Sequence, residues 1–132
     1  MRRQDRPLYV VTGTTADEKR VHALERQGMK ILRAGQDARA DGRLLMQALE
    51  DLGFRSVYSI AGPEVLHTLL AAQALDRLYL TLVHLLLGGA EFDPLVTGPE
   101  LNPPANMQLT SLYYDAHAPA AAGQCLAVFD RR

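Results

Sequence analysis

Short apolar runs alternate with segments of helical periodicity from residue 8 to residue 86, and this alternation limits the fold more than any other feature of the chain. The expected strands are 8–11, 29–32, 56–60 and 78–86. The expected helices are 16–27, 45–52 and 63–75. Strands and helices that alternate pair in parallel through right-handed crossovers, with helices on both faces of one sheet. The sequence therefore predicts a three-layer αβα fold of the α/β class, with four parallel strands.

Residues at the ends of these segments support the expected helices. Thr15 and Glu18 have the spacing of a capping box, in which each side chain satisfies a backbone N–H at a helix start. Gly28 and Gly53 follow the first two helices, and glycine readily ends a helix in the left-handed conformation. Pro63 suits the first position of the third helix, because an N–H there would have no helical partner.

The last third of the chain has a different character. Residues 88–105 are rich in glycine and proline, which predicts irregular surface chain. Segments 108–115 and 124–129 have strand composition and predict an antiparallel hairpin beside the strand at 78–86. The apolar content of 78–86 is typical of a central strand covered on both faces. The sheet is therefore expected to be mostly parallel, with an antiparallel hairpin at its C-terminal end.

Charge and apolar content exclude several classes of function. The chain has 14 basic and 15 acidic side chains, and a net charge of -1 gives no field to attract nucleic acid. The apolar segment 78–87 is interrupted by Thr81 and His84 and is shorter than the ~20 residues that span a bilayer, so we expect no membrane association. A length of 132 residues suits one domain, 1–132. The single cysteine, Cys125, is expected to be a buried free thiol, which suits the cytoplasm.

Three motifs together resemble a known family. They are Ser59–Leu66 (SIAGPEVL), Leu75–Thr81 (LDRLYLT) and Leu86–Gly89 (LLGG). Their order and spacing resemble the reductase domain of the bifunctional riboflavin biosynthesis deaminase-reductase, which is dihydrofolate-reductase-like. The resemblance covers residues 8–129. It implies NADPH-dependent reduction of a small pyrimidine phosphate, as in a 5-amino-6-(5-phosphoribosylamino)uracil reductase, in which a ribosylamino group becomes a ribitylamino group.

The chain departs from this family pattern in two ways. Ile60 stands where the family usually has Glu, Ala61 where it has the first Gly, and His84 near a common Pro. The family domain also begins with two further strands and their helices, so the resemblance implies that this chain lacks the first strands. If the sheet closes over the two gaps that these strands would leave, the resemblance implies the strand order 2-1-3-4. It is then either a fragment of a longer reductase or a reduced relative. The alternative function is a non-catalytic nucleotide-binding or oligomerising domain derived from the same fold.

The first candidate cofactor site is the turn Ala61-Gly62-Pro63, which leads from an expected strand into an expected helix. Free N–H groups and the helix dipole favour an anion at such a turn. Gly62 would let a cofactor pyrophosphate approach the backbone closely. Glu64 and Val65, in the first turn of the expected helix, are further candidate NADPH contacts. The alternatives are a purely structural turn and, for Glu64, a charge that stabilises the helix start.

The second candidate cofactor site is Thr12, Gly13 and Thr14, at the end of the first expected strand. The resemblance implies that this region approaches the adenosine ribose of NADPH and its phosphate. Thr15 is sufficiently explained as a helix cap.

Neither a metal nor a catalytic side chain is expected. The four histidines, His22, His67, His84 and His117, lack the spacing of metal ligands. Glu64 and His67 have the spacing of half a di-iron site, but the second copy is missing. His84 is expected to be a hydrogen-bonded core histidine. No side chain has the signature of an activated nucleophile, and hydride transfer from a nicotinamide needs none.

We also expect self-association. Truncation relative to the family would expose apolar faces of 78–87 and of the helix that carries Val65 and Leu69, and large exposed apolar patches usually mark an interface. A two-fold homodimer is the default symmetry.

Overall fold

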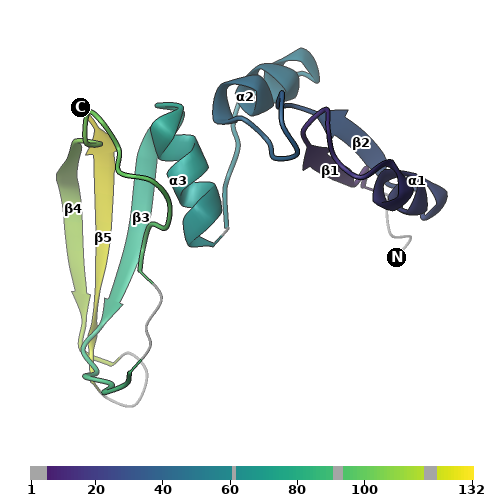
Figure 1. The fold of residues 1–132 in the computed structure, drawn as a ribbon. Coiled ribbons are helices and arrows are strands. Elements are labelled where there is room, and N and C mark those ends of the chain that lie inside the picture. The colour runs from purple at the N-terminus through teal and green to yellow at the C-terminus, as the bar shows by residue number, and fades with distance from the viewer. Residues whose placement is uncertain (1–5, 61, 91–93, 118–121) are drawn as a thin grey trace. The chain divides into compact units, whose positions relative to one another are not determined.

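The computed structural model of the protein describes residues 6–60, 62–90, 94–117 and 122–132 (Figure 1). Contacts within the chain divide it into two units, Met1–Ile60 and Ala61–Arg132. Each unit is described by itself, and the expectation that 1–132 forms one domain stays a prediction. No helix in the described ranges is long and apolar enough to cross a membrane.

The first unit begins with a parallel β-α-β arrangement. Strand β1 (Tyr9–Thr12) pairs in parallel with β2 (Lys30–Arg33), and helix α1 (Glu18–Arg26) forms the crossover between them. Gly28 follows α1 with a φ of 83°, which confirms the predicted left-handed stop. The neighbouring, parallel placement of the first two strands is therefore confirmed.

The helix starts in this unit are capped by aspartates. Asp17 is the N-cap of α1 and accepts a hydrogen bond from the N–H of Lys19 at 2.9 Å, so the predicted Thr15 cap is wrong. The helix begins at Glu18, two residues later than expected, and the aspartate before it is a preferred N-cap residue. Asp41 caps α2 (Gly42–Asp51) by accepting from Arg43 and Leu44.

Residues 54–60 are extended but form no strand, so the predicted strand at 56–60 is wrong. Tyr58 is 85% exposed and Ile60 is fully exposed. β-Branched and aromatic residues favour a strand only when a neighbouring strand and a packed face are present. Within the described ranges, nothing pairs with this segment.

The second unit is built on an antiparallel sheet. Its strands are β3 (Arg77–Val83), β4 (Met107–Asp115) and β5 (Gln124–Arg131), in the order β3-β5-β4. The predicted antiparallel hairpin is confirmed by the pairing of β4 with β5. The pairing shifts by one residue between Leu109 and Ser111, where a bulge interrupts β4.

Strand β3 differs from the prediction in its place. It lies at the edge of the described three-stranded sheet, so the central, doubly covered strand is wrong. The order 2-1-3-4 is also wrong, because it requires the strand at 56–60 that does not form. The hairpin lies beside β3 as predicted, with β5 as its neighbour. Among the described residues, parallel pairing is limited to β1 and β2, and the sheets are mixed rather than mostly parallel. Continuous apolar content predicted burial on both faces, yet Tyr79 and Leu82 remain exposed.

Helix α3 (Pro63–Ala71) precedes the sheet, and Pro63 occupies its first turn as predicted. It ends four residues before the expected Leu75. Gln73 has a φ of 55° and donates its N–H to Leu70, while Ala74 donates to Leu69. These two bonds form a Schellman motif in which glutamine takes the left-handed position usually held by glycine.

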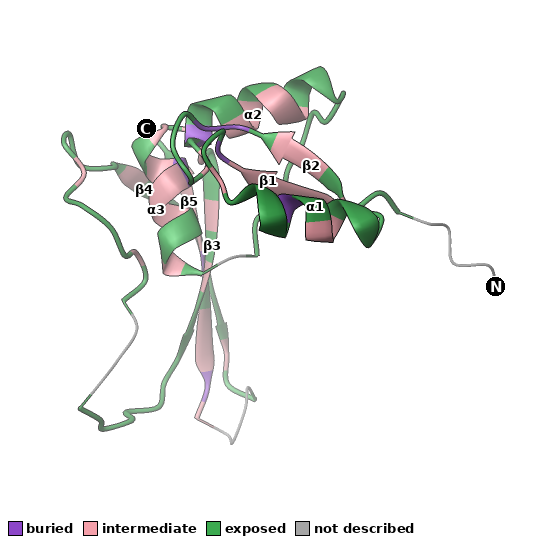
Figure 2. Ribbon diagram, turned by 45° about the vertical axis from the view of Figure 1, so that its right-hand side comes forward, coloured by how far each residue is buried: buried purple, intermediate pink, exposed green. Residues whose placement is uncertain are grey.

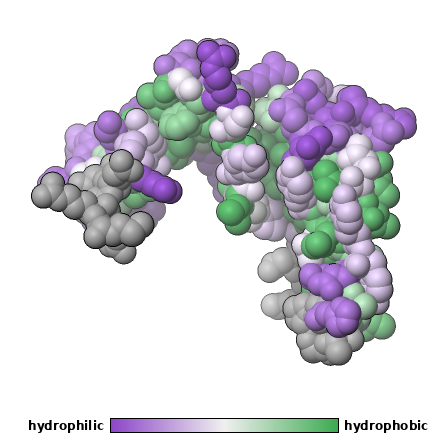
Figure 3. All heavy atoms as spheres, turned by 180° about the vertical axis from the view of Figure 1, so that it is seen from behind, coloured by the Kyte–Doolittle hydropathy of each residue, from purple (hydrophilic) through white to green (hydrophobic). Residues whose placement is uncertain are grey.

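Few apolar side chains in the described ranges are buried (Figure 2). They are Val21 and Ala34 in the first unit and Leu69 and Ala127 in the second. Figure 3 shows hydrophobic side chains at the surface beside hydrophilic ones. The described parts therefore leave much apolar surface in water, and such surface usually marks an interaction site.

Candidate functional site

The N-terminus of α3 is open to an approaching ligand. Gly62 is the N-cap residue with a φ of -71°, and no side chain caps the helix. A Cβ placed on Gly62 would have no neighbouring heavy atom within 4 Å. The carbonyl oxygen of Gly62 accepts hydrogen bonds from the N–H groups of Val65 and Leu66 at 3.1 and 3.2 Å. The turn therefore has free space, but it does not use the positive φ that only glycine readily adopts.

Few donors remain for an anion at this turn. Pro63 has no N–H, and the N–H groups of Val65 and Leu66 are engaged. Glu64 lies in the first helical turn, where its negative charge interacts favourably with the helix dipole but would repel a phosphate. Ala61, which the sequence also places at this site, lies outside the described residues.

A loop far along the chain contacts the same end of α3. The N–H of Thr97 donates to the carbonyl of Pro63 at 3.3 Å, and His67 Nε2 lies 2.7 Å from the carbonyl oxygen of Pro99. Gly98 lies so close to the His67 ring that a Cβ there would overlap it. The sequence did not predict this contact. Gly98-Pro99 marks a turn, but no local signal identifies α3 as the helix that the turn contacts.

The turn after β1 is held by a second loop. The N–H groups of Gly13, Thr14 and Thr15 donate to carbonyl oxygens of residues 35–38 at 2.9 to 3.2 Å. The hydroxyls of Thr12 and Thr14 donate to Ala38 and Gln36. Because these donors are used internally, this loop suits a ligand that brings its own donors, such as a ribose, better than it suits a phosphate.

Arg33 places a positive charge beside the turn after β1. Its Nη1 donates to the carbonyl oxygens of Gly13 and Thr14 at 3.3 and 3.2 Å. Its Nη2 lies 2.7 and 2.9 Å from the two carboxylate oxygens of Glu18. Glu18 therefore pairs with Arg33 instead of completing the predicted capping box.

The two predicted cofactor sites lie in different units. Thr12, Gly13 and Thr14 belong to the first unit, whereas Gly62, Pro63, Glu64 and Val65 belong to the second. The assignment of these residues to a cofactor stays a prediction for each unit.

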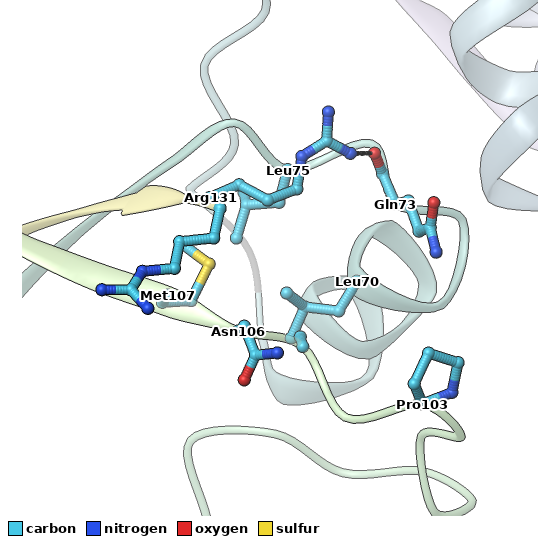
Figure 4. Close-up of a pocket in the computed structure, with 9 residues that line it drawn as sticks. Leu70, Gln73, Leu75, Pro103, Asn106, Met107 and Arg131 are labelled. Carbon is cyan, nitrogen blue, oxygen red and sulfur yellow. Dashed lines mark hydrogen bonds between the residues drawn. The ribbon is translucent and has the colours of Figure 1, made fainter.

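The second unit also contains a cavity of about 480 Å³ that the sequence did not predict (Figure 4). Its lining residues are Leu70, Gln73, Leu75, Pro103, Ala105, Asn106, Met107, Arg131 and Arg132. The Arg131 side chain runs from β5 to the end of α3, where Nη1 donates to the carbonyl oxygen of Gln73. No predicted cofactor residue lines this cavity. Its walls come from three separate segments, so no local sequence pattern could mark it.

His84 lies at the surface rather than in the core, which corrects the expectation for this residue. The predicted hydrogen bond is present, because Nε2 lies 3.3 Å from the Sγ of Cys125. The His84 ring also stacks on Tyr114 with ring centroids 5.6 Å apart. Cys125 is a free thiol, half-buried rather than buried. Within the described ranges, no group of three or more potential ligands can hold a metal ion.

The fold is of the α/β class, with a β-α-β unit in the first part of the chain and an antiparallel hairpin in the second. The family model described as the RibD C-terminal domain matches residues 1–117. The chain therefore belongs to the RibD C-terminal domain family, and the resemblance seen in its motifs is confirmed.

The chain is also similar in fold to a solved structure, whereas no curated protein matches it. The structure is that of a pyrimidine reductase-like protein from Corynebacterium diphtheriae, with a TM-score of 0.69 and 15% sequence identity. The match covers 94% of this chain and 49% of that protein's chain, so this chain spans about half of its relative's length.

Proposed function

We propose that this chain is an NADPH-linked reductase domain of the riboflavin-pathway type, or the C-terminal part of one. The observation that carries the proposal is the family match over residues 1–117. The name of the structural relative, a pyrimidine reductase-like protein, agrees in reaction class. The substrate we propose is a ribosylamino-pyrimidine phosphate. When bound, NADPH would supply the hydride that, with one proton, reduces the ribosylamino group to a ribitylamino group.

The turn at Gly62 is the proposed contact for the cofactor pyrophosphate. The space around Gly62 is open, and the start of α3 offers the positive end of a helix dipole. A glycine here lets a phosphate approach the backbone without meeting a side chain. Pro63, Glu64 and Val65 complete the first turn, and Glu64 weakens rather than strengthens anion binding.

The turn after β1 is the proposed contact for the adenosine ribose. Thr12 and Thr14 use their hydroxyl hydrogens on carbonyl oxygens, so their oxygen lone pairs are available to accept from ribose hydroxyls. Arg33 is the cation beside this turn, and an arginine in this position of a β-α-β unit suits the 2′-phosphate that distinguishes NADPH from NADH. A 2′-phosphate would compete with Glu18 for the Arg33 guanidinium.

A second function is supported by a specific observation. The N–H groups of Gly13, Thr14 and Thr15 are satisfied within the chain, so they are not available to a cofactor phosphate. A non-catalytic domain that binds a nucleotide or assembles with another chain would explain this feature.

Calorimetric titration of the whole chain with NADPH and NADH tests these functions. The reductase proposal predicts saturable binding with a preference for NADPH, followed by oxidation of NADPH when the pyrimidine phosphate is added. Nucleotide binding without turnover would favour the non-catalytic domain. No binding of either nucleotide at millimolar concentration would refute the proposed cofactor role.

A further inference from the structure

The cavity of about 480 Å³ in the second unit lies apart from the turn proposed for the cofactor pyrophosphate (Figure 4). It lies at the C-terminal end of α3, where Leu70, Gln73 and Leu75 form one wall. The turn at Gly62 lies at the opposite end of the same helix, and nine residues at ~1.5 Å each separate the two ends by about 14 Å. The cavity is therefore separate from the proposed cofactor contacts of this unit.

Backbone hydrogen bonds hold the walls of this cavity together. The N–H of Arg131 donates to the carbonyl oxygen of Asp76 at 2.9 Å, and the N–H of Arg132 donates to that of Asn106 at 3.2 Å. These bonds tie the end of β5 to the segments that precede β3 and β4. The cavity volume lies within the range of roughly 300–1,000 Å³ that is typical of small-molecule sites. The cavity therefore has firmly connected walls and room for a small molecule.

One part of the wall is apolar. Leu70, Leu75 and Met107 are half-buried, and Pro103 and Ala105 add exposed apolar surface. An apolar group that entered the cavity would remove this surface from water, which is favourable. Met107 is unbranched and flexible, so it can adjust to the shape of a ring. This wall therefore favours a ligand with an apolar body.

The charged side chains that line the cavity are both positive. They are Arg131 and Arg132, and no acidic side chain is among the described residues that form the lining. Gln73 and Asn106 are the neutral polar residues of the wall. Positive charges beside an apolar wall, where water is partly excluded, attract an anion more strongly than they do in bulk water. The lining therefore favours a ligand with a negative group.

Arg131 is held in a position to bind that negative group. Its Nη1 donates to the carbonyl oxygen of Gln73, which ties the guanidinium to the end of α3 (Figure 4). Its Nη2 lies 3.4 Å from the carboxylate of Asp76, whose side chain is 87% exposed. An ion pair this long and this exposed is weak, so a carboxylate in the cavity can replace Asp76 on Nη2. The planar guanidinium suits the two oxygens of a carboxylate.

We propose that this cavity binds a small organic carboxylate with an apolar body of one or two rings. The carboxylate lies against the guanidinium of Arg131, and Arg132 adds a second positive charge to the same lining. The rings lie against Leu70, Leu75 and Met107. This binding site is additional to the proposed cofactor contacts and does not depend on the proposed reductase function.

Calorimetric titration of the whole chain with 2-naphthoate tests the proposal, because this two-ring acid combines the charge and the apolar body. Neutral 2-naphthylmethanol lacks the charge, and inorganic phosphate lacks the apolar body. Naphthoate is expected to bind at least about tenfold more tightly than either, because the ion pair and apolar burial act together. The proposal is overturned if either comparison probe binds as tightly as naphthoate, or if naphthoate shows no saturable binding at millimolar concentration.

Three substitutions locate the bound probe. Arg131→Gln is expected to weaken naphthoate binding about tenfold and to leave binding of the neutral alcohol unchanged. Ala105→Leu is expected to weaken binding of both, because the larger side chain occupies part of the cavity. The matched charge control is Arg20→Gln, since Arg20 lies in the first unit with a side chain that is 88% exposed. This control is expected to bind naphthoate as the unmodified chain does.

Thermal unfolding shows which variants are folded, and Ala105→Leu decides the outcome if Arg131→Gln fails to fold. Unchanged naphthoate affinity in either folded cavity variant would overturn the proposal, and so would an equal loss in Arg20→Gln. Saturating NADPH is expected to leave naphthoate affinity unchanged, because the cavity lies at the other end of α3 from Gly62. Competition between the two would overturn the assignment of a separate site. Naphthoate titration needs no NADPH, so failure of this proposal and failure of the proposed function are distinguishable.

Discussion

Arg77 and Asp130 face each other across β3 and β5 and form a two-point ion pair. Nε of Arg77 lies 2.5 Å from one carboxylate oxygen and Nη2 lies 3.0 Å from the other. The hydrogen bonds from Arg77 hold the pKa of Asp130 below its usual range, and Asp130 raises the pKa of Arg77. The pair joins the start of one strand to the end of its neighbour.

This relationship predicts a pH-dependent contribution to stability. Because the folded-state pKa of Asp130 is lowered, the contribution is present above the unfolded pKa of about 3.9 and is lost as pH falls through the folded pKa. Asp130→Asn is therefore expected to lower the melting temperature slightly at neutral pH and not at strongly acidic pH. Adding 1 M salt is expected to shrink the difference, since the pair is partly exposed.

A thermodynamic cycle with Arg77→Gln checks that the pair itself is responsible. If the two single substitutions act through one ion pair, their effects are not additive at neutral pH. Additive effects, or a difference that persists at strongly acidic pH, would contradict the account.

The aspartate cap of α1 makes a prediction that differs from the sequence-based one. Asp17→Ala is expected to cost about 1 kcal/mol of the free energy of unfolding, because it removes the acceptor for the Lys19 N–H. Thr15→Ala is expected to have little effect, since Thr15 is not the cap. Urea denaturation measures both changes, and a larger loss for Thr15→Ala would restore the capping-box hypothesis.

Gly13 and Gly35 are expected to be essential for the packing of their loops. A Cβ on Gly13 would overlap the carbonyl oxygen of Asp37, and one on Gly35 would overlap that of Arg39. Each change to alanine is expected to cost about 2 kcal/mol or more, because backbone must move. Gly88→Ala is the matched control, since a Cβ there meets nothing within 4 Å. Thermal unfolding measures the three changes. A loss of stability in Gly88→Ala as large as in Gly13→Ala and Gly35→Ala would contradict this prediction.

Arg33 is expected to set the preference for NADPH over NADH. Arg33→Gln removes the cation beside the turn after β1, so the affinity for NADPH should fall by about tenfold while the affinity for NADH changes little. Titration with both nucleotides separates this effect from loosening of the loop, which would lower the affinity for NADPH and for NADH alike. An unchanged preference would exclude Arg33 from the site.

Local sequence signals predicted much of the first unit and the hairpin. Gly28 and Pro63 marked helix ends correctly, because their backbone restrictions act whatever surrounds them. The strand at 56–60 and the place of β3 were not predictable in the same way. Both depend on whether a neighbouring strand is present, and strand propensity does not carry that information.

In the candidate site, too, local features were predicted and long-range contacts were not. Periodicity and turn residues located the turns at Thr12–Thr14 and at Gly62, because each follows a segment with a clear apolar pattern. The contact of His67 with Pro99 joins residues far apart in the sequence, and the pairing of Arg33 with Glu18 depends on the crossover geometry. Such long-range partners are set by tertiary packing, which no local motif records.

The most direct test of the proposed function is the NADPH affinity of Gly62→Val, measured together with its thermal stability. Valine fits the backbone, because Gly62 has a φ of -71°, and its side chain would enter the open space where the pyrophosphate is proposed to lie. The control Glu64→Gln removes a charge from the same turn without adding bulk. The account predicts that the folded Gly62→Val protein binds NADPH at least about tenfold more weakly, which corresponds to ~1.4 kcal/mol. It predicts that Glu64→Gln binds equally or more tightly. Unchanged affinity in both folded variants would contradict the cofactor role of this turn.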